Sequence, residues 1–148
     1  MNEQALGAAK SAERTAVLAW LRLARVFQKV DRASAVAFAA SGLSVAQFDI
    51  IAQLGRGEGI SQQELADRLL VTKGNISQLI GKMERRGLIT RRPEGRANAL
   101  SLTPEGQRLF ARVVPAQEVH IAALFGALST GERRTLLHLL RALDHSME

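Results

Sequence analysis

The chain has no cysteine, no tyrosine and only one tryptophan among its 148 residues. The lack of cysteine excludes disulfide bonds, thiolate metal sites and redox sensing by a cysteine thiol within this chain. No run approaches the roughly 18 consecutive apolar residues of a membrane-spanning helix. Residues 1–10 lack the basic start and apolar centre of a secretory signal peptide. We therefore expect a soluble cytoplasmic protein with no membrane partner.

The motifs of common enzyme classes are also missing. The sequence has no phosphate-binding loop, no GxSxG nucleophile elbow and no HExxH zinc motif. His120, His138 and His145 have no acidic partners at metal-ligand spacing, so surface or interface positions are the simpler interpretation. The carboxylates are scattered and lie mostly near Lys or Arg, and no catalytic pair can be argued from them. We predict a protein that is not an enzyme and that needs no metal or cofactor.

Apolar and basic residues are both plentiful. Apolar residues make up 47% of the chain and are mainly Leu, Ala, Val and Ile, which favours a helical protein with a substantial core. The formal net charge is +6 and the pI is about 11. This excess of positive charge favours a polyanionic partner, either nucleic acid or an anionic surface. The length suits one domain, or one domain with helical extensions.

Helix signals lie close together in the middle of the chain. Ser61 followed by Glu64 predicts a capping box at the start of a short helix over residues 62–70. Thr72 is the candidate N-cap of a second, longer helix. Gly87 is the natural end of that helix, because glycine accepts the left-handed conformation that often follows a helix.

A hairpin and a further helix are predicted next. Residues 88–92 and 97–102 are short extended runs, and residues 93–96 between them supply turn chemistry. Thr103 and Pro104 then predict a new helix, with Thr at the cap and Pro at the first position. The order helix, turn, helix, hairpin, helix is that of a winged helix-turn-helix.

The second central helix has two different sides. Residues advance about 100° each around an α-helix, so one apolar stripe should pack into the domain. This stripe consists of Ile76, Leu79, Ile80 and Met83. The outer side is polar and basic, with one acid, Glu84, at its margin. Asn and Gln can pair with adenine edges while Lys and Arg contact phosphates, so this side is a candidate DNA-binding surface. An ordinary solvated helix face is the alternative, and the basic hairpin that follows favours DNA.

The ordered set of motifs resembles the MarR (multiple antibiotic resistance regulator) family of bacterial transcription factors. The resemblance rests on ISQQELADRL, VTKGNISQLIGKMERRGLITRR and LSLTPEG, on GLSVAQFDIIAQL ahead of them, and on long flanking helices. It implies a mainly α fold with a small β-hairpin wing, and a homodimer joined by terminal helices. The wing loop is shorter than the family pattern. Glu94 stands where the family usually has Asp, and Arg96 stands at the position of the wing arginine.

Different residues of this domain are expected to contact bases and phosphates. Base readout is expected from Asn75, Ser77 and Gln78. Arg96 is expected to enter the minor groove. The remaining expected DNA contacts, mostly to phosphates, are Ser61, Thr72, Lys73, Lys82, Arg85 and Arg92.

The two ends of the chain are expected to hold the dimer together. Residues 11–43 form the expected N-terminal dimerisation helix, which is apolar on most sides and must therefore bury more than one side. Residues 44–103 form the DNA-binding domain and residues 104–148 the C-terminal dimerisation helices. Residues 1–10 are expected to be disordered. A two-fold dimer places two recognition helices on successive major grooves, so an inverted-repeat site is expected.

Local signals set the expected helix boundaries outside the central segment. Ser44 predicts the cap of a helix over residues 45–54. Pro115 predicts a kink or break within the long helix that follows the wing, because proline removes a helical hydrogen bond. Ser129 with Glu132 predicts a second capping box, at the start of the last helix.

The resemblance also implies a small effector, since family members often bind an aromatic or anionic compound between the dimer helices and the DNA domain. The candidate residues are Trp20, Phe27, Phe48, Asp49 and Phe110. Trp20 and Asp49 offer polar groups among apolar ones, as small-molecule pockets require. A core position for Trp20 and an ion pair for Asp49 are the competing interpretations. The missing cysteine argues against the peroxide-sensing branch of the family.

These observations predict a sequence-specific, DNA-binding transcriptional regulator, a homodimeric repressor that a small organic effector releases from DNA. The alternative is a helical interaction protein that uses a basic surface to bind an acidic partner or an anionic membrane. Both would bind in a salt-dependent way, and only selectivity for a duplex sequence separates them.

Overall fold

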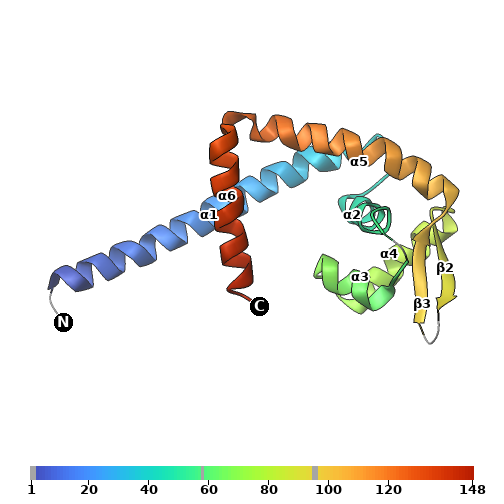
Figure 1. Ribbon diagram of the computed structural model, residues 1–148, viewed down its shortest axis with the longest axis horizontal. Helices are drawn as coiled ribbons and strands as arrows, with labels where there is room; N and C mark the ends of the chain where they lie inside the picture. Colours follow the sequence, from blue (N-terminus) through green and yellow to red (C-terminus); the bar gives the residue numbers. More distant parts are fainter. Residues whose placement is uncertain (1–2, 58, 95–96) are drawn as a thin grey trace. The chain divides into compact units, whose positions relative to one another are not determined.

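The computed structural model describes residues 3–57, 59–94 and 97–148, and the chain divides into two compact units, Met1–Val45 and Ala46–Glu148. Helices dominate both units, and the second unit adds a small antiparallel sheet (Figure 1). Within the described residues, none of the helices combines the length and the apolar character that a membrane crossing requires. The fold class is the mainly helical one with a β wing that the sequence predicted.

The first unit is one long helix, α1, which spans Glu3–Ala39. Residues 3–10, expected to be disordered, belong to this helix, and the abundant Glu, Gln, Ala and Leu in that stretch are strong helix formers. The helix ends where Gly42 adopts a left-handed φ of 68°. The Leu43 N–H then donates to the Phe38 carbonyl (3.1 Å), which satisfies a carbonyl that the helix leaves open.

The second unit begins with three helices: α2 (Val45–Leu54), α3 (Gln62–Leu69) and α4 (Lys73–Arg85). Ser61 caps α3, because its Oγ accepts from the Glu64 N–H (3.1 Å). This is one half of the predicted capping box, and the Glu64 carboxylate binds Arg68 (2.5 Å). Thr72 caps α4 as predicted, with its Oγ1 accepting from the Asn75 N–H (3.3 Å).

Both α3 and α4 end in the same backbone arrangement. After α3, Leu70 has a left-handed φ of 53° and the Val71 N–H donates to the Ala66 carbonyl (3.1 Å). After α4, Gly87 has a φ of 72° and the Leu88 N–H donates to Met83 (3.0 Å). These are Schellman turns, which place one left-handed residue just after the helix. Gly87 is the residue expected at such a position, whereas Leu70 is not.

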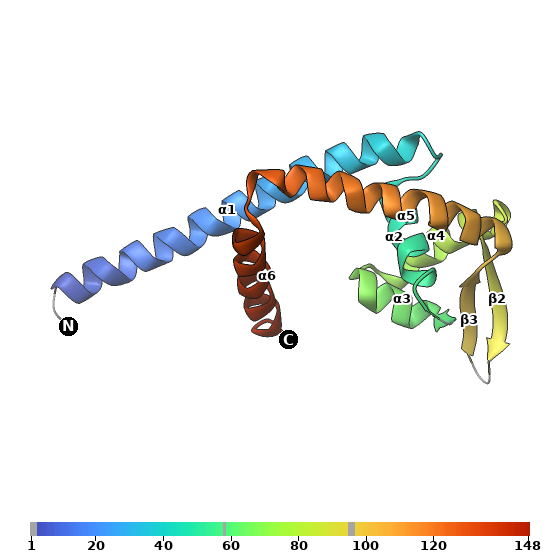
Figure 2. The ribbon, with the colours of Figure 1, turned by 45° about the horizontal axis from the view of Figure 1, so that its top comes forward.

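The sheet has three strands, β1 (Ile60–Ser61), β2 (Ile89–Glu94) and β3 (Ala97–Leu102), in the order β1-β3-β2. Figure 2 shows β2 and β3 as the paired arrows of the wing. The sequence did not predict β1. It also placed residues 93 and 94 in the turn, whereas β2 runs to Glu94, which pairs with Ala97. Because β2 is an edge strand, the missing N–H of Pro93 is tolerated there.

The core of the second unit lies where α2, α3, α4 and the sheet meet. The largest fully buried side chains are Ile50, Ile51, Leu65, Ile76, Ile80, Met83 and Leu100. Three of these belong to the predicted inner stripe of α4, and the fourth member of that stripe, Leu79, is half-buried. The stripe therefore fixes which side of α4 faces outward.

The chain ends with α5 (Pro104–Leu124), the 3-10 turn η1 (Phe125–Ala127) and α6 (Thr130–His145). Of the kink or break predicted at Pro115, the break does not occur, since α5 is continuous through this residue. Proline removes a single backbone hydrogen bond, and the turns on either side of it hold the helix. The capping box at Ser129 is confirmed, with the Ser129 N–H donating to Glu132 Oε2 (2.7 Å) and the Glu132 N–H to Ser129 Oγ (3.2 Å).

Candidate DNA-binding surface

The outer side of α4 is open to solvent along its whole length. Ile76, Ile80 and Met83 are completely buried on the inner side. Each residue expected to contact DNA from α4 or its cap is exposed: Thr72, Lys73, Asn75, Ser77, Gln78, Lys82 and Arg85. The helix therefore presents amide, hydroxyl and cationic groups together, the combination that reads base edges and holds phosphates.

Charge on this surface is strongly one-sided. Residues 70–92 contain six basic side chains and one acid, Glu84. The Glu84 carboxylate accepts from Arg91 Nε (2.9 Å), so its charge is paired. Arg91 also donates from a terminal nitrogen to Gln62 Oε1 (3.1 Å). The sequence did not single out Arg91, because its partners are seven and 29 positions away along the chain.

The other expected DNA contacts lie at the edges of this surface. Ser61 is half-buried and its hydroxyl oxygen is engaged in the cap of α3. Arg92 is exposed on β2, opposite Ala99 of β3. Arg96, the expected minor-groove contact, lies outside the described residues. The structure thus brings the α4 residues together and sets Arg92 on the neighbouring strand.

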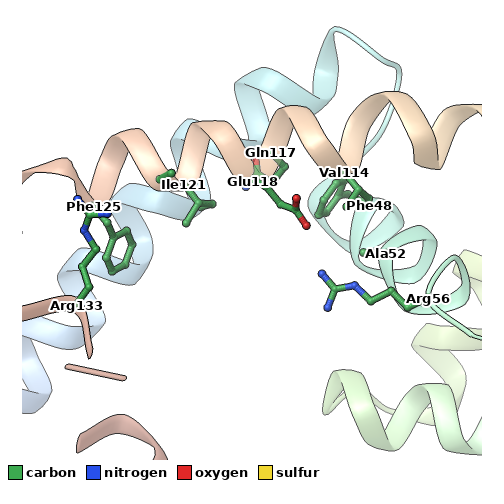
Figure 3. A pocket seen from close by; sticks show the side chains of 10 residues that line it. Phe48, Ala52, Arg56, Val114, Gln117, Glu118, Ile121, Phe125 and Arg133 are labelled. Atoms are coloured by element: carbon green, nitrogen blue, oxygen red, sulfur yellow. The ribbon is translucent and has the colours of Figure 1, made fainter. Parts of the chain in front are cut away.

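A cavity of about 520 Å³ lies elsewhere in the second unit, between α2, α5 and the start of α6. Figure 3 shows the side chains of Arg56 and Glu118 projecting into the same space. The lining residues are Phe48, Ala52, Arg56, Val114, Gln117, Glu118, Ile121, Ala122, Phe125 and Arg133. A mostly apolar lining with a few charged groups is typical of a small-molecule binding site.

One of the five predicted effector residues, Phe48, lines this cavity. Asp49 is exposed on α2, and the Phe110 ring packs at Gly55, in the space that an added Cβ would need. Trp20 and Phe27 belong to α1 and are 64% and 67% exposed. The missed lining residues of α5 recur at helical spacing (114, 117, 118, 121), a signal that the sequence did contain.

A tight turn between two helices, a recognition helix with a polar outer side and an adjoining β wing define a winged helix-turn-helix DNA-binding domain. Comparisons with known proteins support this class. The model of the MarR family matches residues 41–97. A transcriptional regulator of the HTH type from Bacillus cereus, itself uncharacterised, is 30% identical over 128 residues, which cover 86% of this chain and 87% of its own. The chain therefore belongs to the MarR family of transcriptional regulators.

Solved structures show the same fold. A MarR family regulator from Listeria monocytogenes, complexed with a 26mer DNA, superposes with a TM-score of 0.79 at 21% identity, over 86% of this chain and 87% of that one. BpsR of Bordetella bronchiseptica gives a TM-score of 0.72 at 25% identity, over 82% and 90% of the two chains. Its structure concerns the regulation of its DNA binding by 6-hydroxynicotinic acid. Membership of this family makes the chain a DNA-binding regulator rather than an enzyme, as the sequence predicted.

Proposed function

We propose that this protein is a homodimeric repressor that binds an inverted-repeat duplex through α4 and the wing, and that a small organic effector releases it. The observation that carries this proposal is the exposed outer side of α4, where the polar and basic residues stand opposite an apolar stripe whose members Ile76, Ile80 and Met83 are completely buried. Asn75, Ser77 and Gln78 read bases, while the cationic side chains around them hold phosphates. Arg96 is proposed from the sequence alone as the minor-groove contact.

The proposed dimer is supported by apolar surface that the single chain leaves uncovered. Every residue of α6 is at least partly exposed, including Leu137, Leu139, Leu140 and Leu143. On α1, Val17, Leu18, Trp20, Leu21 and Phe27 are all more than half exposed. Soluble monomers rarely expose contiguous apolar patches of this kind. A second copy of the chain covers both helices and relates the two α4 helices by a two-fold axis, about 34 Å apart.

Sedimentation equilibrium tests the dimer. At micromolar concentration the mass should be twice the 16.1 kDa of the chain. A folded monomer of the chain mass would refute the proposal, because the apolar sides of α1 and α6 would then have no cover.

The effector is proposed to be an aromatic or heteroaromatic carboxylic acid. The cavity offers Phe48 and Phe125 to a ring, and Arg56 and Arg133 to a carboxylate. The Arg133 Nε already donates to the Leu128 carbonyl (3.0 Å), which leaves the Arg56 guanidinium and the terminal nitrogens of Arg133 as donors to a ligand beside the Glu118 carboxylate. Similarity to BpsR supports the class and supplies a first compound to test.

Calorimetry with 6-hydroxynicotinic acid and a panel of phenolic acids tests this part. A compound that binds should release DNA, and DNA should weaken its binding by the same factor, because coupling between two sites is reciprocal. Arg56→Met should reduce its affinity, whereas Arg112→Met, an exposed arginine of α5 outside the cavity lining, should not. If no compound binds, or if both variants lose affinity equally, the cavity is not the effector site.

Repression is tested by transcription in vitro from the promoter that carries the protein's binding site. Adding the protein should lower transcript yield, and the variant Gln78→Ala should lower it less. A rise in transcript yield would make the protein an activator and would leave the DNA-binding surface unaffected.

A further inference from the structure

Arg91 holds an unusual position for an arginine of a DNA-binding wing. Its strand, β2, pairs with β3 so that Arg91 stands opposite Leu100, and Leu100 stands opposite Ile60 of β1. Residues in one such row share a face of the sheet. Leu100 and Ile60 are buried, at 0% and 9% exposure, so this is the face that covers the core. Arg91 is therefore at the outer end of the core-facing row.

The guanidinium of Arg91 joins three elements. It donates to Glu84 Oε1 of α4 (2.9 Å) and to Gln62 Oε1 at the start of α3 (3.1 Å), while its backbone belongs to β2. A planar guanidinium has several donors in a fixed arrangement, so it can fix the relative positions of two acceptors. The first residue of α3, the end of the recognition helix and the wing are thereby linked through one side chain.

The ion pair contributes little to folding. The side chains of Arg91 and Glu84 are 34% and 33% exposed, and partly solvated pairs of this kind are weak because water competes for both charges. The pair nevertheless cancels the one negative charge among residues 70–92. An unpaired carboxylate at this place would repel the phosphates that the neighbouring cations attract.

We propose that Arg91 is a positioning residue for DNA binding, which acts through Glu84 by holding and masking its carboxylate at the end of α4, and that Arg91 does not itself contact phosphate. The proposal rests on the α4 surface argued above. Arg92, the next residue, lies on the opposite face of β2 because side chains alternate along a strand. Two adjacent arginines then have different roles, with Arg91 facing inward to the helices and Arg92 open to a phosphate.

A rescue experiment separates the two roles. Duplex affinity is measured over a range of salt concentrations for the full-length protein, for Arg91→Met, for Glu84→Gln and for the double variant. Arg92→Met, alone and combined with Glu84→Gln, is the matched control. Thermal unfolding and sedimentation establish that each variant keeps its fold and its assembly, and Arg91→Lys tests whether a point charge can replace the guanidinium.

We expect Arg91→Met to bind duplex about three- to tenfold more weakly, a change typical of one uncompensated charge near a binding surface. Adding Glu84→Gln should restore the affinity to within about twofold, since the unmasked charge is then gone, and the double variant should keep the wild-type salt slope. Arg91→Lys should recover part of the loss. Arg92→Met should lose about one unit of salt slope, and Glu84→Gln should not rescue it.

Three results would overturn the proposal. If Arg91→Met loses a unit of salt slope that Glu84→Gln does not restore, Arg91 contacts phosphate directly. If the duplex affinity of Arg91→Met is unchanged, or if it falls and Glu84→Gln does not restore it, Arg91 does not act through Glu84. If Arg91→Met, Arg92→Met and Gln78→Ala all bind duplex as tightly as the wild-type protein, the DNA-binding surface lies elsewhere and the proposed function itself fails.

Discussion

Among the residues that the structure describes, Leu70 is the one that has a positive φ without being glycine. It is 93% exposed. It follows α3 in a Schellman turn, the position that Gly87 occupies after α4. A Cβ in the left-handed region costs roughly 1–2 kcal/mol, and an exposed side chain returns almost nothing through burial. The turn of the helix-turn-helix is therefore strained, and Leu70→Gly should stabilise the protein.

The magnitude follows from two opposing effects. Glycine removes the steric cost of the left-handed conformation, but it raises the backbone entropy of the unfolded chain by an amount equal to about 0.5–1 kcal/mol. The net gain is about 0.5–1 kcal/mol per chain, and each kcal/mol corresponds to about 2–4 °C in melting temperature for a domain of this size. Leu70→Ala should change stability by less than about 0.5 kcal/mol, because alanine keeps the strain and little packing is lost.

Chemical and thermal unfolding are monitored by circular dichroism at one fixed protein concentration, since a dimer's stability depends on concentration. Gly87→Ala is the mirror control. It introduces a Cβ at a φ of 72° in open space, so it should cost about 1 kcal/mol. If Leu70→Gly proves less stable than Leu70→Ala, the left-handed strain assigned to this turn is wrong.

Three further variants test the proposed function. Gln78→Ala should cost about 1–3 kcal/mol on the specific site and relax selectivity at one position per half-site, and an equal loss on random duplex would show that Gln78 does not read bases. Arg96→Ala should weaken specific and random binding alike and remove about one unit of salt slope, with unchanged melting, whereas an unchanged slope would show that the wing tip does not touch DNA. Leu140→Asp should shift sedimentation toward the monomer, because it places a charge on the uncovered apolar side of α6, and an unchanged dimer would exclude that side from the interface.

Local features of the fold could be predicted from the sequence because their chemistry acts over a few residues. Thr72 and Ser129 cap the helices that the sequence assigned to them, and Gly87 ends α4 as expected. The inner stripe of α4 was predictable for the same reason, since helical spacing alone puts Ile76, Ile80 and its other members on one side.

Features that depend on distant pairing could not be predicted in this way. Strand β1 has two residues and exists only because Ile60 and Ser61 meet β3, some 40 residues later along the chain. The Arg91 contact with Gln62 has the same origin, as does the ring of Phe110 against Gly55. The extension of β2 through Pro93 required knowing that this strand lies at the edge of the sheet.

Selection from a random duplex library tests the central claim most directly, because the operator sequence need not be known beforehand. The full-length protein should recover one family of sequences, arranged as an inverted repeat whose half-site centres are about 10–10.5 base pairs apart. This spacing is the distance between two α4 helices related by a two-fold axis on one side of the duplex. Recovery of unrelated sequences, or of a half-site with no inverted partner, would contradict a dimeric regulator that reads DNA through α4.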